Sequence, residues 1–100
     1  MRARRVDENQ QEIVDALRQA GATVRVVTQG EGIPDLLCGY TNPASGKQHT
    51  LLLEVKDGNK PPSARKLTAA EEKFFMEWTG GILAIVKSAE EALDLIRGLD

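Results

Sequence analysis

The sequence is poor in residues that cross-link a chain or stack against a ligand. It has one cysteine, one histidine and four aromatic residues among 100. Cys38 alone cannot form an internal disulfide, so nothing indicates an oxidising compartment. Because His49 lies in a polar stretch that we expect to be a loop, Cys38 is more typical of a small buried strand residue than of a catalytic thiol.

Long apolar runs are also missing. No stretch approaches the roughly 20 apolar residues that a membrane helix needs, and the basic residues 1–5 are not followed by the apolar stretch of a signal peptide. We therefore expect no membrane association and a cytoplasmic protein. With 41% hydrophobic and 28% charged residues, the composition is that of a globular protein, and the length suits one domain over residues 1–100.

An excess of basic charge is absent as well. The net charge of −2 counts against nucleic acid as a partner, because domains that bind it are commonly basic. The cations are nevertheless concentrated in two stretches. Residues 1–5 hold three arginines, and residues 56–66 hold four cations against the one carboxylate of Asp57.

The spacing of apolar residues predicts a single α/β unit with the order αβββαβα. Thr68 with Glu71, and Ser88 with Glu91, are capping-box patterns, and Asp7 is a candidate N-cap for the first helix. Turn-forming residues between the second and third strands predict a hairpin, and the stretch after the third strand reads as an exposed loop. The expected helices are 7–20, 68–78 and 89 to about 98, and the expected strands are 22–28, 33–40, 50–56 and 82–86.

Two apolar strand-like segments contain ionisable residues. Residues 32–37 include Asp35, and residues 51–58 include Glu54 and Lys56. An ionised group in such a place costs several kcal/mol unless it is paired or bound to metal. Side chains alternate between the faces of a strand, so Glu54 and Lys56 share a face about 6 to 7 Å apart. If Asp35 comes from the neighbouring strand, two carboxylates and an ammonium converge, and such oxygens are the ligands that Mg²⁺ or Mn²⁺ prefers.

Each of these residues also has an explanation that involves no catalysis or metal binding. A proline followed by aspartate, as at Pro34 and Asp35, is common in turns. Glu54 and Lys56 could form an ion pair on a half-exposed strand, although Leu52 on the same face argues against a solvated surface.

The pattern Pro34-Asp35, eighteen further residues, then Glu54-Val55-Lys56 resembles the PD-(D/E)xK nuclease superfamily. Within it, the chain is most similar to the small phage and bacterial nucleases of the VRR-NUC and Holliday-junction-resolvase-like branch. The resemblance extends from the helix that ends at residues 17–21 to residues 67–71. It implies a restriction-endonuclease-like αβββαβ core with a mixed central sheet flanked by helices, to which the C-terminal helix is added.

The resemblance implies a DNA endonuclease that depends on Mg²⁺ or Mn²⁺. Asp35, Glu54 and the Val55 backbone carbonyl would hold the metal, and Lys56 would position water and stabilise charge on the phosphate. So small a domain favours backbone and shape recognition of branched, flapped or nicked DNA. The alternatives are a catalytically weak or partner-dependent DNA-binding accessory module of the same fold, and a structural protein whose charged strand residues form ion pairs.

Two further acids are candidates for the site. Relatives often supply an acid from the first helix, which points to Glu12, although Glu8 competes with it and a solvated helix face explains both. Relatives often have glutamine where this chain has Glu71, and a capping box explains that residue without catalysis.

Contacts with DNA are expected from the loop after the third strand and from the N-terminal arm. The aromatic residues of the second helix are expected in the core rather than in base stacking. The resemblance further implies a homodimer, phage or host replication and recombination proteins as partners, and the host cytoplasm if a phage encodes the chain. The candidate DNA-binding residues are Lys60, Arg65, Lys66, Arg4 and Arg5.

Overall fold

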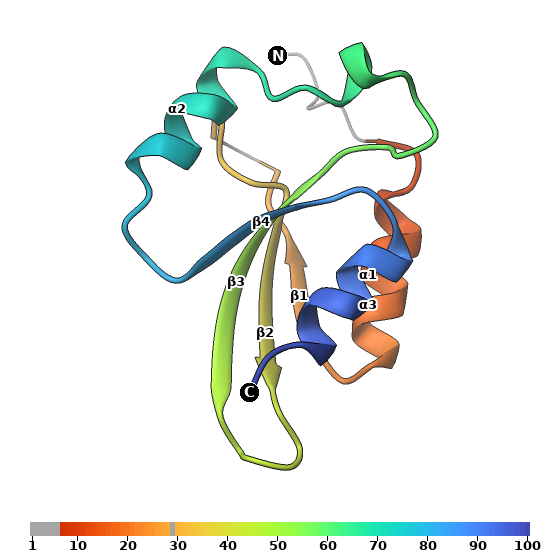
Figure 1. Ribbon diagram of the computed structural model, residues 1–100, viewed down its shortest axis with the longest axis vertical. Helices are drawn as coiled ribbons and strands as arrows, with labels where there is room; N and C mark the ends of the chain where they lie inside the picture. The colour runs from red at the N-terminus through yellow and green to blue at the C-terminus, as the bar shows by residue number, and fades with distance from the viewer. Residues whose placement is uncertain (1–6, 29) are drawn as a thin grey trace.

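The computed structural model describes residues 7–28 and 30–100. The order of the elements in these residues is the predicted αβββαβα, with one 3-10 helix added before the second α-helix (Figure 1). The elements are α1 (Gln10–Gln19), β1 (Thr23–Val26), β2 (Leu36–Thr41), β3 (Gln48–Val55), η1 (Pro62–Arg65), α2 (Ala69–Glu77), β4 (Ile82–Val86) and α3 (Ala89–Arg97).

The four strands form one mixed sheet in the order β1-β2-β3-β4. The first three strands are antiparallel, whereas β3 and β4 are parallel. The predicted hairpin joins β2 to β3, and the Asn42 side chain accepts hydrogen bonds from the backbone N–H groups of Ala44 and Ser45 in its turn. This turn chemistry sets the register of the hairpin, in which Leu36 lies opposite Leu53.

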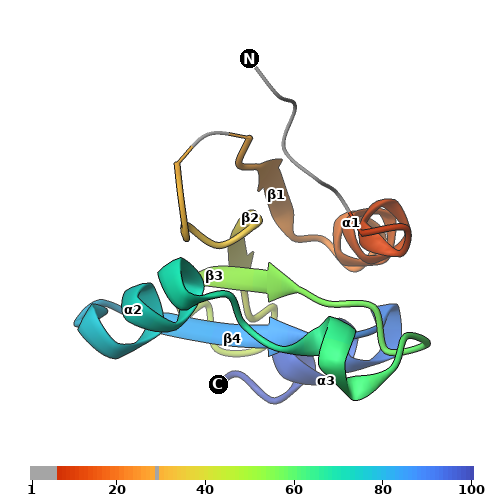
Figure 2. The ribbon, with the colours of Figure 1, turned by 90° about the horizontal axis from the view of Figure 1, so that it is seen from above.

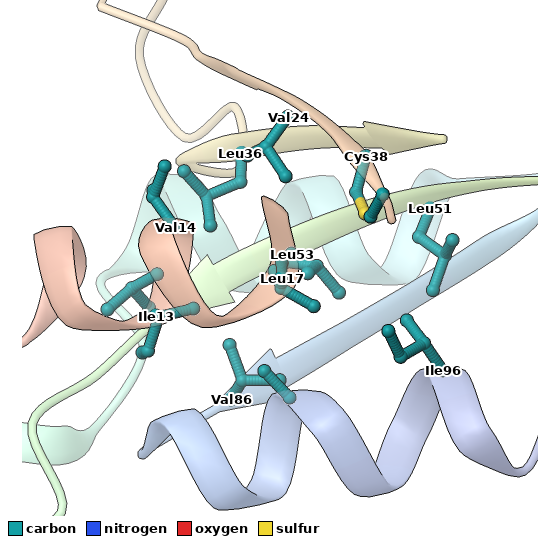
Figure 3. Packing of buried hydrophobic residues seen from close by; sticks show 13 residues of the cluster. Ile13, Val14, Leu17, Val24, Leu36, Cys38, Leu51, Leu53, Val86 and Ile96 are labelled. Carbon is teal, nitrogen blue, oxygen red and sulfur yellow. The ribbon is translucent and has the colours of Figure 1, made fainter. Parts of the chain in front are cut away.

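The helices cover the two faces of the sheet unequally. Figure 2 shows α1 and α3 on one side of the sheet and α2 on the other. The side of α1 and α3 is the hydrophobic core, where every second strand residue points inward (Figure 3). The core side chains that are fully shielded from solvent are Ile13, Leu17, Leu36, Cys38, Leu51, Leu53, Val55 and Ala92.

The opposite face carries α2, and its packing differs from the expectation. No residue of α2 is buried, so the prediction that its aromatic residues belong to the core is wrong. Phe74 and Trp78 stack on each other with ring centroids 5.4 Å apart, and Trp78 is 39% exposed. The loop before β2 comes close to this helix, since a Cβ on Gly32 would lie 2.5 Å from the Ala70 carbonyl oxygen.

Three other local expectations need correction. The second strand begins at Leu36 rather than at residue 33, because Pro34 has no N–H to donate to a ladder. Asp7 is not the N-cap of α1, since that position is Asn9. His49 lies in β3 rather than in a loop, whereas Cys38 is buried as expected, and this burial raises the pKa of its thiol.

No helix within the described residues has both the length and the hydrophobicity needed to span a bilayer.

Candidate active site

The β2–β3 hairpin brings the two predicted carboxylates together at one end of the sheet. Asp35 directly precedes β2 and Glu54 is near the end of β3, so the antiparallel register sets them side by side. The Asp35 Oδ2 atom accepts a hydrogen bond of 2.7 Å from the backbone N–H of Val55. Asp35 is 8% exposed and Glu54 is 2% exposed, so both carboxylates are largely removed from water.

Lys56 lies between two carboxylates. Its Nζ atom is 2.9 Å from Glu71 Oε1 and 3.7 Å from Glu54 Oε2. Burial alone would lower the pKa of Lys56, but the hydrogen bond to Glu71 and the charges of Glu71 and Glu54 outweigh burial and raise it. The lysine is therefore a fixed cation at neutral pH.

Glu71 reaches this position because of its place in α2. Thr68 is the N-cap, and the predicted capping box is complete, because Glu71 Oε1 also accepts a 2.8 Å hydrogen bond from the Thr68 backbone N–H. Burial alone would raise the pKa of Glu71, but hydrogen bonds from Lys56 and Thr68 lower it. The same oxygen thus caps the helix and binds the lysine.

Glu54 is the least solvated charged group of this cluster. Burial, followed by hydrogen bonding with Asp35 and Glu71 and by their negative charges, raises the pKa of Glu54 to about 10. Its Oε1 atom is buried without a hydrogen-bond partner among the described residues. Without an added cation the cluster therefore retains a proton at neutral pH, because closely spaced carboxylates cannot all ionise.

A fourth acid, which the sequence pattern did not assign to the site, borders the same cavity. Asp7 lies just before α1, and burial raises its pKa more than the nearby Lys56 and Lys60 lower it. The pattern suggested an N-cap role for Asp7, so its place beside the hairpin was not expected. The cavity has a volume of about 340 Å³ and is lined by Asp7, Asp35, Glu54, Lys56, Lys60, Ala64, Lys66, Thr68 and Glu71.

The remaining predicted residues are divided between this cavity and other places. Lys60 and Lys66 border it, whereas Glu12 and Arg65 line a neighbouring cavity of about 320 Å³ together with the buried Asp57. The structure therefore does not bring Glu12 to the carboxylate cluster. Asp57 also departs from the expected exposed loop, because it is buried and accepts a hydrogen bond from the Asn59 N–H. The predicted contacts of Arg4 and Arg5 lie outside the described residues.

The donor set suits a cation that keeps much of its water shell. In residues 7–28 and 30–100, no three acidic, histidine or cysteine side chains are arranged as a ready-made metal cage. Mg²⁺ is commonly bound by one or two carboxylates, with water and substrate phosphate filling its other positions. Asp35 and the buried oxygen of Glu54 meet that smaller requirement.

The arrangement of the sheet, the helices and the acidic cluster defines a class of fold. A four-stranded mixed sheet is flanked by helices, and its hairpin presents two acids and a lysine at one end. These are the features of the restriction-endonuclease-like α/β fold that the sequence led us to expect.

A comparison with solved structures agrees with this class. A structure described as a "VRR_NUC domain" matches 94% of this chain and 100% of its own, with a TM-score of 0.57 and 24% sequence identity. No protein-family model matches the sequence, and neither does any curated protein. The chain therefore has the fold of a VRR-NUC domain, which confirms the predicted resemblance at the level of structure.

Proposed function

We propose that this chain is a divalent-metal-dependent DNA endonuclease that hydrolyses phosphodiester bonds. The observation that carries the proposal is the buried Glu54 carboxylate, which lies beside Asp35 with an unpartnered oxygen and one lysine at hand. A protein that needed only a stable sheet would gain by placing an apolar residue there, because a buried carboxyl group is costly. The likeness to a VRR_NUC domain supports the same conclusion.

Asp35 and Glu54 would hold Mg²⁺ or Mn²⁺, together with the Val55 carbonyl. The N–H and C=O of one strand residue leave on the same side, and the Val55 N–H is directed to Asp35. A divalent ion held at this position would lower the pKa of bound water and polarise a phosphate. Lys56 would stabilise the negative charge that develops on the phosphate, because its ammonium is already fixed and charged.

We further propose that Asp7 supplies the acid that was expected from Glu12. Asp7 borders the same cavity as Asp35 and Glu54, whereas Glu12 borders the neighbouring one. An acid at the start of α1 would then complete the carboxylate group around the cation. Its effect would be on metal affinity more than on the position of Lys56.

Recognition of the DNA would depend mainly on its backbone and shape. Lys60 and Lys66 border the cavity and would bind phosphates near the cleaved bond. Few side chains near the site could read bases, which favours branched, flapped or nicked DNA as substrates. A homodimer would present two sites to two strands, and sedimentation of the purified protein with and without four-way DNA would test this.

The test of the proposed activity compares two lysine variants. The purified protein, Lys56→Ala and Lys47→Ala are incubated with labelled linear, flapped, nicked and four-way DNA in Mg²⁺, Mn²⁺ or EDTA. Lys47→Ala removes the same charge from the exposed β2–β3 turn, at the other end of the hairpin, and should behave as the wild type. We expect metal-dependent cleavage by the wild type and by Lys47→Ala, and none by Lys56→Ala.

Two outcomes would contradict the proposal. DNA binding without cleavage by the folded wild type would favour the accessory module. Neither binding nor cleavage, with no stabilisation by Mn²⁺ in a melting experiment, would favour a structural protein, because an ion that binds the native state must stabilise it.

A further inference from the structure

A second pair of cations lies on the far side of η1 from the carboxylate cavity. Arg65 and Lys87 line a shallow pocket of about 430 Å³, together with Pro62, Ile85 and Glu91. Ala64 and Lys66, from the same segment as Arg65, border the carboxylate cavity instead. Figure 1 shows the chain after β3 turning back above the sheet through η1 before it enters α2. Different residues of the η1 segment thus line different pockets, and Arg65 and Lys87 also line the cavity of about 320 Å³ that contains Glu12 and Asp57.

Lys87 is positioned next to Lys56 by the parallel pairing of β3 and β4. The register sets Glu54 beside Ile85, and the Lys56 N–H donates to the Val86 carbonyl oxygen at 3.0 Å. Side chains alternate along both strands, so Ile85 faces the same side of the sheet as Glu54, and Lys56 and Lys87 directly follow the two strands. Neighbouring strands are about 4.8 Å apart. Lys87 thus lies about one strand spacing from the lysine of the proposed active site.

The two cationic side chains of this second pocket have no acidic partner among the described residues. Neither Arg65 nor Lys87 forms an ion pair within the part of the chain that the structure describes, and Arg65 Nε is buried without a hydrogen-bond partner there. The Glu91 carboxylate accepts a hydrogen bond from the Lys87 backbone N–H, so it is engaged by the backbone rather than by either cationic side chain.

The chemistry of this pocket matches one nucleotide of a DNA strand. Two cations can bind a phosphate, with the fork of an arginine suited to its oxygens. Ile85 is 36% exposed and, with Pro62, offers apolar surface to a sugar or a base.

We infer that Arg65 and Lys87 bind the phosphate of a nucleotide that flanks the cleaved bond. This inference rests on the proposed nuclease function and adds a second binding position to it. Lys60 and Lys66 contact the strand on one side of η1, and Arg65 and Lys87 contact it on the other. The strand would pass across η1 between the two pockets, with Lys56 at the bond that is cut.

The test measures DNA binding as a function of salt. Fluorescence anisotropy with a labelled duplex and a labelled flapped duplex is recorded between 50 and 200 mM salt in EDTA, for the wild type, Arg65→Ala, Lys87→Ala and Lys47→Ala. Each of the two site variants should weaken binding about tenfold and lower the slope of log affinity against log salt by about 1. Lys47→Ala, from the hairpin turn, should leave the slope unchanged.

A purely structural role is separated by the melting temperature and the cleavage kinetics. The Lys87 side chain makes no hydrogen bond within the described residues, so Lys87→Ala should fold as the wild type does. Its KM for DNA should rise while kcat changes little. A wild type that cuts DNA with an unaltered salt slope in both site variants would overturn this inference alone. A wild type that neither binds nor cuts would overturn the proposed function and this inference together.

Discussion

Replacing Glu54 by glutamine should change the way in which stability depends on pH. The pKa of Glu54 is about 10 in the folded protein, whereas that of an exposed glutamate is about 4.5. Between these values the folded state holds a proton that the unfolded state has lost. The free energy of unfolding of the wild type must therefore fall as pH rises through this window, and it is highest below pH 4.5 for this group.

The size of the effect follows from one proton. A difference of one bound proton changes the free energy of unfolding by about 1.4 kcal/mol per pH unit. Between pH 6 and pH 8 the wild type should lose about 3 kcal/mol relative to Glu54→Gln, which has no proton to release. For a chain of this length that is a difference of roughly 10 to 20 °C in melting temperature.

Urea unfolding at several pH values in EDTA measures the effect. The comparison with Glu54→Gln removes the contributions of groups that the two proteins share, including Asp7, whose raised pKa acts in the same direction from about pH 3.8 upward. Adding Mn²⁺ should stabilise the wild type more at pH 8 than at pH 6, since the ion displaces the proton, and should do little for the variant. Parallel curves for the two proteins in EDTA would refute the reasoning, because Glu54 would then be ionised in the free protein.

Three other perturbations have defined outcomes. Glu71→Gln keeps a capping-box acceptor and should lower the free energy of unfolding in urea by about 1 kcal/mol. Glu71→Ala loses both the cap and the partner of the buried lysine and should lower it by about 2 to 4 kcal/mol. Equal losses in the two variants would contradict this expectation. Gly32→Ala should destabilise the folded protein by more than about 1 kcal/mol, because the φ of +78° at Gly32 is combined with a close approach to α2. Gly46→Ala should cost less in the same assay, because Gly46 has a φ of +75° but lies in open space. In calorimetry, Asp7→Asn should weaken Mn²⁺ binding about tenfold, whereas Glu12→Gln should leave it unchanged. If Glu12→Gln weakened binding and Asp7→Asn did not, Glu12 would be the further acid of the site, as the sequence predicted.

Much of the fold could be predicted because short-range chemistry decides it. The turn around Asn42 and the capping box of Thr68 and Glu71 depend on neighbours within three residues, and both are present. At Ser88 only half of the predicted capping box forms, because the Ser88 side chain accepts from the Glu91 N–H whereas the Glu91 carboxylate accepts from the Lys87 N–H. The surroundings of the aromatic side chains of α2 were not predictable in this way. Their apolar character indicates burial, but the helix lies on the outer face of the sheet, where only tertiary packing decides how much is covered.

The same distinction between local patterns and tertiary packing applies to the residues of the candidate site. Asp35, Glu54 and Lys56 belong to one hairpin, so strand alternation and a turn were enough to group them. Asp7 and Glu12 border different cavities. Which of the two acids borders the carboxylate cavity depends on how the chain enters α1 beside the sheet, and no local sequence pattern encodes that. The separation of Arg65 from Lys66 likewise depends on where the 3-10 turn ends, because Arg65 is its last residue and Lys66 follows in an extended conformation.

The end of the sheet that carries the site is protected against fraying. Strand ends usually open and close easily, and catalytic groups placed there would lose their alignment. Here the pairing continues past β3 and β4, since the Gly58 N–H donates to the Lys87 carbonyl oxygen, and the Asn9 side-chain amide donates to the carbonyl oxygens of both Lys56 and Lys87. Asn9, the N-cap of α1, thus holds the ends of both strands together, and amide hydrogens at this end should exchange with solvent as slowly as those in the middle of the sheet.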